Sequence, residues 1–412
     1  MRELISSLDI GSSKIKLVVA EMLNDSLNVL CAIEEDSRGV KKGAICEPDE
    51  TEYAIRKILK KGEELLGVKI SKVLVTVNED SVDFKIGEAE IDIKDDEEVN
   101  ATDIQKVLQM SVGNNIHKGN DLVSVIPIMF KVDDQKTRMP KGLKGSSLKV
   151  KSVIVSAPRR DIYVLAKLLE KCGVEIVDIM IPSIGSYYAH KNESTDTLTG
   201  IVVDCGAETI KVGVFNKGII INNLVLPIGG KNIDNDIGFI YKLDSAQSKK
   251  IKETFAFANK RNASPKEIEQ VVNTLGEKVS LNQYEVSEVA MSRLQENLNM
   301  AKNEINYLTK KEISYIIITG GLTEFKGFSL GAESVFGTKA SVGKLLVVGA
   351  RDNKYATCIG MIKYFDEKLK LREHEYSMFT QDEIDIISGV SERKMISSDS
   401  ILGKVFGIFF DN

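Results

Sequence analysis

The sequence predicts an α/β protein whose core is duplicated into two halves around a cleft. Over residues 8–19 an apolar strand enters an Asp-x-Gly turn and a second apolar strand leaves it, and residues 203–214 repeat this pattern without a gap. A third apolar strand, at residues 315–318, ends close to two glycines. A repeated unit of this kind indicates a duplicated domain, and helical apolar patterns between the strands indicate sheets covered by helices.

Composition restricts the function classes. The chain has 412 residues, of which 43% are hydrophobic, enough for two domains with cores of their own. A net charge of -5 argues against a dedicated nucleic-acid binder. The five cysteines form no Cys-x-x-Cys pair, so we expect no zinc site and no disulfide framework, and a reducing cytoplasm as the compartment. We also expect no secretory leader and no membrane-spanning run.

The first Asp-x-Gly turn has the chemistry to hold a phosphate group. Gly11 lets backbone N–H groups approach an anion, and the hydroxyls of Ser12 and Ser13 add donors. Asp9, at the end of the strand, suits a hydrated Mg²⁺ ion, and Lys16 follows in the outgoing strand. Alone the signal is weak, because Asp-x-Gly-Ser also occurs in ordinary hairpin turns.

The repeat strengthens this interpretation. It aligns Asp204 with Asp9 and Gly206 with Gly11, and it places Thr209 in the second turn. If the two halves face each other, both turns converge on one polyphosphate from opposite sides. We therefore expect Asp9 and Asp204 to flank a metal ion and to hold it through water.

The strand at residues 315–318 adds the third part of the predicted site. It is followed by Gly320 and Gly321, where missing side chains let a flat purine and its ribose lie against the backbone. The two turns and the glycine pair together predict ATP and Mg²⁺ as cofactors.

These motifs resemble those of the actin-like ATPase superfamily and, within it, of the FtsA family of bacterial cell-division proteins. Four further stretches are closer to the FtsA family than to the superfamily at large: residues 37–43 (Ser-Arg-Gly-Val-Lys-Lys-Gly), 125–127, 142–145 and 227–230. The resemblance implies a duplicated actin-like (ribonuclease-H-like) ATPase core with an inserted small α+β domain of the SHS2 type. In FtsA-type proteins this insertion contacts other subunits and other division proteins.

The resemblance also sets the expected domain boundaries. In chain order we expect the first core subdomain (1–80), the inserted SHS2-type subdomain (81–158), the first core subdomain continued (159–199, with a hinge from 191), the second core subdomain (200–242), a smaller and largely helical subdomain (243–305), the second core subdomain with a crossover helix (306–365), a linker (366–399) and an amphipathic membrane-targeting helix (400–412).

Apolar periodicity predicts the principal elements. We expect strands at residues 27–32, 72–77, 84–93, 122–132 and 148–156, and helices at residues 52–66, 101–110, 161–172, 286–305 and 381–387.

The resemblance implies further site residues and a protein partner. Gly230 falls in the family's turn into the helix beneath the nucleotide, and Lys252 matches a lysine that reaches the adenosine. FtsA-type proteins hold the acidic, apolar C-terminal peptide of the tubulin-like protein FtsZ on the smaller subdomain. Arg293 and Lys302 lie beside the apolar stripe of a helix there and are the candidate contacts.

Residues 400–412 have the pattern of an amphipathic helix that lies in the membrane interface. The residues of its apolar face, and so the predicted membrane contacts, are Ile401, Leu402, Val405, Phe406, Phe409 and Phe410. A helix of this length is too short to span a bilayer. FtsA-type proteins end in such an anchor, which implies peripheral attachment to the cytoplasmic side of the cell membrane at the division site.

The second turn departs from the pattern of active superfamily members. Ala207 and Glu208 stand where a glycine-rich run with threonine is usual. A carboxylate near phosphate oxygens repels them unless a metal ion lies between. We therefore expect at most a slow ATPase, in which the nucleotide is chiefly a structural and regulatory ligand, and we name no catalytic residue.

The sequence thus predicts an ATP-binding, filament-forming protein that tethers FtsZ filaments of the division ring to the membrane. Two alternatives remain open. Small-molecule kinases share the core and need an acidic base in the cleft, for which Glu208 is a candidate by position only. A type IV pilus assembly adaptor of the same superfamily also carries the insertion, but residues 37–43 and the tail favour the division protein.

Overall fold

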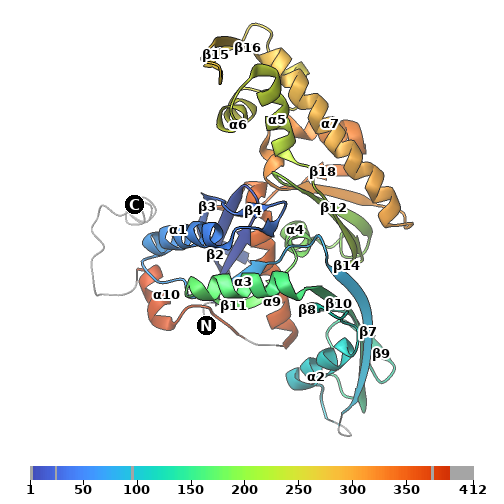
Figure 1. Ribbon diagram of the computed structural model, residues 1–412. Coiled ribbons are helices and arrows are strands. Elements are labelled where there is room, and N and C mark those ends of the chain that lie inside the picture. The colour runs from blue at the N-terminus through green and yellow to red at the C-terminus, as the bar shows by residue number, and fades with distance from the viewer. Residues whose placement is uncertain (1–2, 24–25, 94–96, 373–374, 390–412) are drawn as a thin grey trace, which may run out of the picture.

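The first half of the chain is built on a five-stranded mixed sheet (Figure 1). The computed structural model describes residues 3–23, 26–93, 97–372 and 375–389. The sheet has the order β11-β6-β1-β2-β3, with β1 parallel to β6 and antiparallel to β2. Its strands are β1 (Glu3–Ile10), β2 (Lys14–Leu23), β3 (Ser26–Asp36), β6 (Lys72–Thr76) and β11 (Glu175–Met180).

The second half repeats this sheet strand for strand. Its order is β14-β13-β12-β17-β18, and β12 is again parallel to one neighbour, β17, and antiparallel to the other, β13. The strands are β12 (Thr199–Cys205), β13 (Ile210–Asn216), β14 (Ile219–Leu226), β17 (Tyr315–Thr319) and β18 (Ala340–Val342). The duplication predicted from the two Asp-Gly turns is therefore present in the sheet topology.

Helices cover the first sheet, and a small hairpin stands beside it. The helices are α1 (Pro48–Leu66), α3 (Arg159–Lys171) and α9 (Ala356–Arg372), and a fourth, α4 (Pro182–His190), packs against α9 and against β12 and β13 of the second sheet. The hairpin is β4 (Val40–Lys41) with β5 (Ala44–Ile45). Helix α1 starts earlier than the predicted 52–66, because a proline suits the first turn of a helix. It ends at Gly67, whose left-handed conformation lets its N–H reach the carbonyl of Glu63.

Helices α4 and α9 cross at the base of the cleft between the halves. They touch at Gly185 and Gly360, where a Cβ on Gly360 would lie 1.6 Å from the Gly185 carbonyl oxygen. Two glycines are needed here because any side chain would separate the helices. The expected crossover helix is thus α9, preceded by a short 3-10 turn at Asn353–Tyr355.

The insertion is a separate α+β domain with its own core. It comprises β7 (Asp83–Asp92), α2 (Ala101–Val112), β8 (Asn120–Val132), β9 (Gln135–Thr137) and β10 (Ser147–Pro158). The strands form an antiparallel sheet in the order β7-β10-β8-β9, and α2 packs on it through Ile104 and Val107. The domain joins the first half through buried side chains of β8 and β10, such as Val123 and Val155, and through the Ser124 and Tyr364 hydroxyls, 3.2 Å apart.

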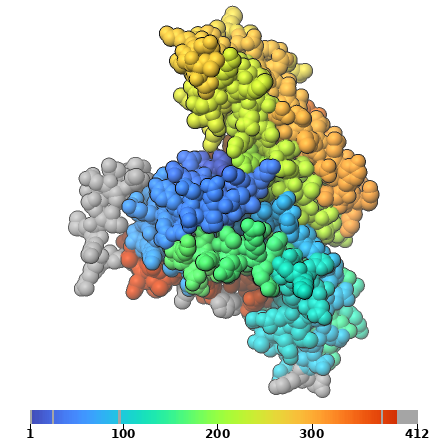
Figure 2. All heavy atoms as spheres, viewed as in Figure 1, coloured from blue at the N-terminus to red at the C-terminus, as the bar shows by residue number. Residues whose placement is uncertain are grey.

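The smaller subdomain of the second half is mostly helical, but it also contains a β-hairpin that the sequence did not predict. It contains α5 (Gly230–Tyr241), α6 (Ser245–Thr254) and α7 (Gln283–Leu308), but also the hairpin of β15 (Ile268–Val272) and β16 (Lys278–Asn282). Its strands are only five residues long and mostly exposed, and just Val279 and Leu281 of β16 alternate with polar residues, too short a pattern to predict a strand. Helix α8 (Phe328–Phe336) packs against α7. Figure 2 shows this subdomain and the insertion as lobes at opposite ends of the molecule.

The expected linker at residues 366–399 is folded over much of its length. Helix α9 continues to Arg372, and the predicted short helix is α10 (Gln381–Ile387). Between them Met378 is buried in the first core and its N–H donates to the Leu4 carbonyl at 2.9 Å. This charged segment has few apolar residues, so its sequence did not predict that it would pack on the first core. Among the described residues, no helix is both long and apolar enough to cross a membrane; the tail at 400–412 lies outside them.

Candidate functional site

A cleft of about 1170 Å³ lies between the two halves. Every residue predicted to contact the nucleotide lines it: Asp9, Gly11, Ser12, Ser13, Lys16, Asp204, Gly206, Thr209, Gly230, Lys252, Gly320 and Gly321. These residues come from the strands and turns of both sheets and from helices α5 and α6 of the second half. The structure therefore brings together, in one cavity of the size that ligands occupy, residues that lie up to about three hundred positions apart in the sequence.

The two Asp-Gly turns are closed by the same hydrogen bond. The Gly11 N–H donates to the Lys14 carbonyl at 3.1 Å, and the Gly206 N–H donates to the Thr209 carbonyl at 2.9 Å. The strands that flank each turn also have the same register, which pairs Asp9 with Lys16 across the first hairpin. The second hairpin pairs Asp204 with Lys211 across its strands in the same register. The repeat is therefore one of hydrogen bonding as well as of sequence.

Asp9 is buried and held by polar partners. Its Oδ2 accepts from the Lys16 Nζ at 2.9 Å, and its Oδ1 accepts from the Thr76 hydroxyl at 3.2 Å. Burial alone would raise the pKa of Asp9, but the ammonium groups of Lys16 and Lys211 outweigh it and hold the pKa below its usual range. Asp9 is consequently an ionised carboxylate with both oxygens already engaged.

The donor set suits a metal ion bound through water. Asp204, at the matching position of the second turn, accepts one long hydrogen bond of 3.4 Å from the Ser186 hydroxyl. The described residues contain no group of three or more histidine, cysteine or acidic side chains placed to hold a metal ion directly. Two carboxylates that face a polyphosphate are what a hydrated Mg²⁺ ion uses.

Gly320 is required by the close approach of β17 to the second turn. Its φ is +94°, and a Cβ there would lie 2.2 Å from the Asp204 Oδ1. Gly321 is different, because a Cβ on it would meet only the Lys354 Cβ at 3.7 Å. The backbone of Gly320 thus fits tightly against Asp204, whereas Gly321 leaves open space on the cleft side.

Lys252 is placed in the cleft wall but is already paired. Its Nζ forms an ion pair of 2.7 Å with Asp234 and donates to the Gly230 carbonyl at 3.3 Å. The Gly230 N–H in turn donates to the Gly206 carbonyl at 3.0 Å. Lys252 therefore fixes the start of α5 against the second turn.

The sequence did not identify several cleft residues. The Lys249 Nζ lies 3.5 Å from the Ser13 hydroxyl, across the cleft from α6. Lys211 lines the cavity as the cross-strand partner of Asp204. Its equivalence to Lys16 in the repeat was a signal that could have identified it. The resemblance put Lys249 at the glutamate position of the family's Glu-x-x-Lys pair, but only the fold shows its contact with the first turn.

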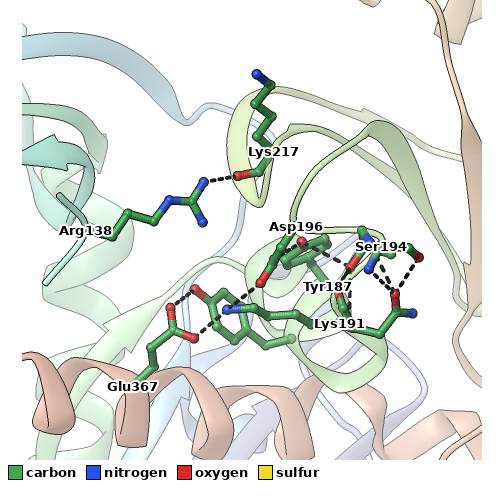
Figure 3. Close-up of polar contacts among 10 residues, drawn as sticks. Arg138, Tyr187, Lys191, Ser194, Asp196, Lys217 and Glu367 are labelled. Carbon is green, nitrogen blue, oxygen red and sulfur yellow. Dashed lines mark hydrogen bonds and ion pairs between the residues drawn. The ribbon is translucent and has the colours of Figure 1, made fainter. Parts of the chain in front are cut away.

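The loop at the predicted hinge is held by side chains (Figure 3). Lys191 contacts both Glu367 of α9 and Asp196, and its Nζ stands 4.6 Å from the centre of the Tyr188 ring. The Tyr187 hydroxyl donates to Asp196 at 2.7 Å. The predicted hinge at 191–199 is thus a loop anchored to α4 and α9.

The cations predicted to bind a peptide are also paired within the smaller subdomain. The Arg293 Nε and Nη2 donate to Asp236 at 2.5 and 3.1 Å. The Lys302 Nζ donates to the Val335 carbonyl, at the end of α8, at 2.6 Å. The most exposed apolar side chain of this subdomain is instead Phe239 of α5, at 87%.

Comparisons with known proteins identify the family. The family model of the cell division protein FtsA matches residues 201–360, and that of the SHS2 domain inserted in FtsA matches residues 81–156. The cell division protein FtsA of Bacillus subtilis (strain 168) is 27% identical over 366 residues, 88% of this chain and 83% of that protein. The chain belongs to the FtsA family. FtsA of Escherichia coli (strain K12) is 24% identical, over 89% of this chain and 91% of that protein.

Solved structures support the fold. A structure of the PilM-PilN type IV pilus biogenesis complex is similar with a TM-score of 0.58 and 14% identity, over 87% of this chain and 97% of that chain. MreB5 of Spiroplasma citri bound to ADP is similar with a TM-score of 0.55 and 12% identity, over 89% and 97%. The predicted actin-like core with an SHS2 insertion is thereby confirmed.

Proposed function

We propose that this cell-division protein binds ATP with Mg²⁺ in its cleft, polymerises on the cytoplasmic membrane and tethers FtsZ filaments of the division ring to it. The main support is the pair of Asp-Gly turns, closed by identical hydrogen bonds and facing one cavity from the two halves. Membership of the FtsA family supports the cellular role.

Each group of cleft residues has its own task in this proposal. The turn N–H groups around Gly11 and Gly206 and the Ser13 hydroxyl bind phosphate oxygens, and Lys16 neutralises their charge. Asp9 and Asp204 hold Mg²⁺ through water, and the ion would screen the phosphates from both carboxylates. Gly320 and Gly321 lie against the adenosine, so the nucleotide joins the two halves and favours one subunit shape.

Turnover of ATP is expected to be slow. The second turn has Ala207 and Glu208, and the Glu208 carboxylate is bound to Lys231 at 2.7 Å. A phosphate-release assay on the purified protein should give a rate well below about 10 s⁻¹, a usual value for metabolic enzymes. A rate at or above that value would contradict a chiefly structural nucleotide.

The kinase alternative is not favoured by the state of Glu208. Burial would raise the pKa of Glu208, but hydrogen bonds from Lys231 and from the Lys42 N–H lower it below the usual range. A general base needs a pKa near the working pH and a free oxygen facing the substrate hydroxyl. Glu208 has neither.

The FtsZ peptide is proposed to bind on the smaller subdomain by an apolar contact. Phe239 and Ile240 are 87% and 52% exposed at the end of α5, and exposed aromatic side chains are frequent anchors of interfaces. Because Arg293 and Lys302 are paired internally, they would steer an acidic peptide more than hold it.

Phe239→Ser is expected to reduce FtsZ recruitment at least tenfold. Vesicles, this protein, ATP and FtsZ polymers are mixed, and the FtsZ that pellets with the vesicles is measured. The fold should be unaffected, because Phe239 buries almost no surface. Tyr307→Ser is the matched control, since Tyr307 is 79% exposed near the end of α7. Undiminished recruitment by Phe239→Ser would refute this contact.

A further inference from the structure

Glu208 joins the two halves of the protein across the cleft. It belongs to the second turn, yet its Oε2 accepts a hydrogen bond of 2.8 Å from the backbone N–H of Lys42, in the β4–β5 hairpin of the first half. Its Oε1 accepts from the Lys231 Nζ at 2.7 Å. One carboxylate is therefore bound by a backbone amide of one half and an ammonium group of the other.

The β4–β5 turn contacts both Asp-Gly turns. Lys42 and Gly43 have φ values of 49° and 80°, and successive residues with left-handed backbone can present their N–H groups as a small anion-binding nest. The Lys42 N–H binds Glu208, and the Gly43 N–H donates to the Ser12 hydroxyl at 2.8 Å. Ser12 is one of the predicted phosphate contacts, so its hydroxyl is now held by this turn.

The surroundings of Glu208 have the character of a phosphate site. Backbone N–H groups beside a lysine are the usual donors to a terminal phosphate, and a carboxylate is an anion of similar donor needs. Lys231, Gly43 and Glu208 all line the cleft with the predicted phosphate turns. Among the described residues, Glu208 is the one acidic side chain that accepts from an N–H of the β4–β5 turn, that of Lys42.

We infer that the Glu208 carboxylate occupies the position of a terminal phosphate, so that a triphosphate displaces it and a diphosphate does not. This inference rests on the proposed nucleotide binding and adds a specificity-determining residue to it. In the diphosphate state Glu208 keeps the β4–β5 turn attached to the second half. In the triphosphate state the phosphate takes over Lys231 and the Lys42 N–H, while the Ser12 hydroxyl, which accepts from the Gly43 N–H, has its own proton to donate to the phosphate.

The contacts of Glu208 in the cleft would therefore differ between a bound diphosphate and a bound triphosphate. Like charges so close cannot share the two donors, so Glu208 must move when a third phosphate enters. The β4–β5 hairpin lies on the surface beside α1, and its Lys41 side chain is exposed. Displacement of Glu208 therefore replaces a direct link between this surface hairpin and the second turn with one that runs through the nucleotide.

The first test compares affinities for MgADP and for the Mg²⁺ complex of a non-hydrolysable ATP analogue by calorimetry. Glu208→Gln keeps an oxygen for the Lys42 N–H but removes the charge. We expect the affinity for the triphosphate to rise about tenfold and that for MgADP to change less than twofold. Glu253→Gln is the matched control, because Glu253 also lines the cleft but has no bond across it.

The second test follows the Lys42 amide by hydrogen exchange. In the wild type this amide should stay protected with MgADP and with the triphosphate analogue, whose phosphate replaces Glu208. In Glu208→Ala it should exchange at least tenfold faster without nucleotide and with MgADP, and regain protection with the triphosphate.

The outcomes separate this inference from the proposed function. If the wild type binds both nucleotides and Glu208→Gln leaves their affinity ratio unchanged, Glu208 does not respond to the third phosphate and the inference is overturned. An unprotected Lys42 amide in the wild type overturns it as well. If the wild type binds neither nucleotide, the proposed function fails, and the inference fails with it.

Discussion

Gly321→Trp should abolish nucleotide binding without unfolding the protein. An indole at this position would fill the space beside β17 in which the adenosine is proposed to lie. A Cβ at residue 321 meets only the Lys354 Cβ, at 3.7 Å, so the backbone tolerates a side chain. We expect the affinity for MgATP to fall at least a hundredfold, about 2.7 kcal/mol, in isothermal titration calorimetry.

The neighbouring glycine would be a poor choice for this experiment. At Gly320 the φ of +94° and the contact of 2.2 Å with Asp204 mean that any side chain strains the fold. Loss of binding there would not separate a blocked site from an unfolded one. Glu333→Trp, on an exposed position of α8, is the matched control for the added tryptophan. If Gly321→Trp binds MgATP with wild-type affinity, the adenosine does not lie beside Gly321.

The sequence predicted the fold of the core because a repeat specifies it twice. The alignment of Asp204 on Asp9 predicted two equivalent hairpins, and the equal registers across both turns are its structural expression. Apolar strands and amphipathic helices carry their own patterns, so elements such as α2 and α10 lie close to the predicted positions. The repeat also predicted the cleft residues of the two turns, whereas Gly230 and Lys252 came from the resemblance to the FtsA family.

The features that the sequence could not predict depend on contacts between residues far apart in the chain. The β15–β16 hairpin buries only Leu281 fully, and its two short strands give too few alternating residues to predict it. No apolar pattern around Met378 predicted that it would pack beside Leu4. Glu208 was read as a repulsive neighbour of the phosphates, and only the fold brings the Lys42 N–H and Lys231 to its two oxygens. Such pairings depend on tertiary structure, which local periodicity does not encode.

Replacing two phenylalanines of the tail should detach the protein from membranes. Residues 400–412 lie outside the described residues, so this prediction rests on their sequence. Phe406 and Phe409 fall on one face of a helix with Ile401, Leu402 and Val405. An apolar side chain contributes about 1.5–3 kcal/mol when fully buried. In the interface burial is partial and ordering of the helix opposes it, so one tail should bind weakly.

Weak binding by one tail makes attachment depend on assembly. The single positive charge of Lys404 is outnumbered by the negative charges of Asp399 and Asp411, so the tail has little attraction to anionic lipid. When subunits join a filament, each bound tail raises the effective concentration of the next at the membrane. Membrane recruitment and polymerisation should therefore rise together with protein concentration.

The measurement is co-sedimentation with vesicles that contain anionic phospholipid. Phe406→Glu combined with Phe409→Glu should pellet no more than the protein does without vesicles, because two charges would have to enter the apolar layer. Gly403→Glu combined with Gly407→Glu adds the same charge on the opposite face of the helix and should still pellet. If the phenylalanine variant pellets like the wild type, this tail is not the anchor. If both variants fail alike, added charge rather than a lost apolar face is the cause.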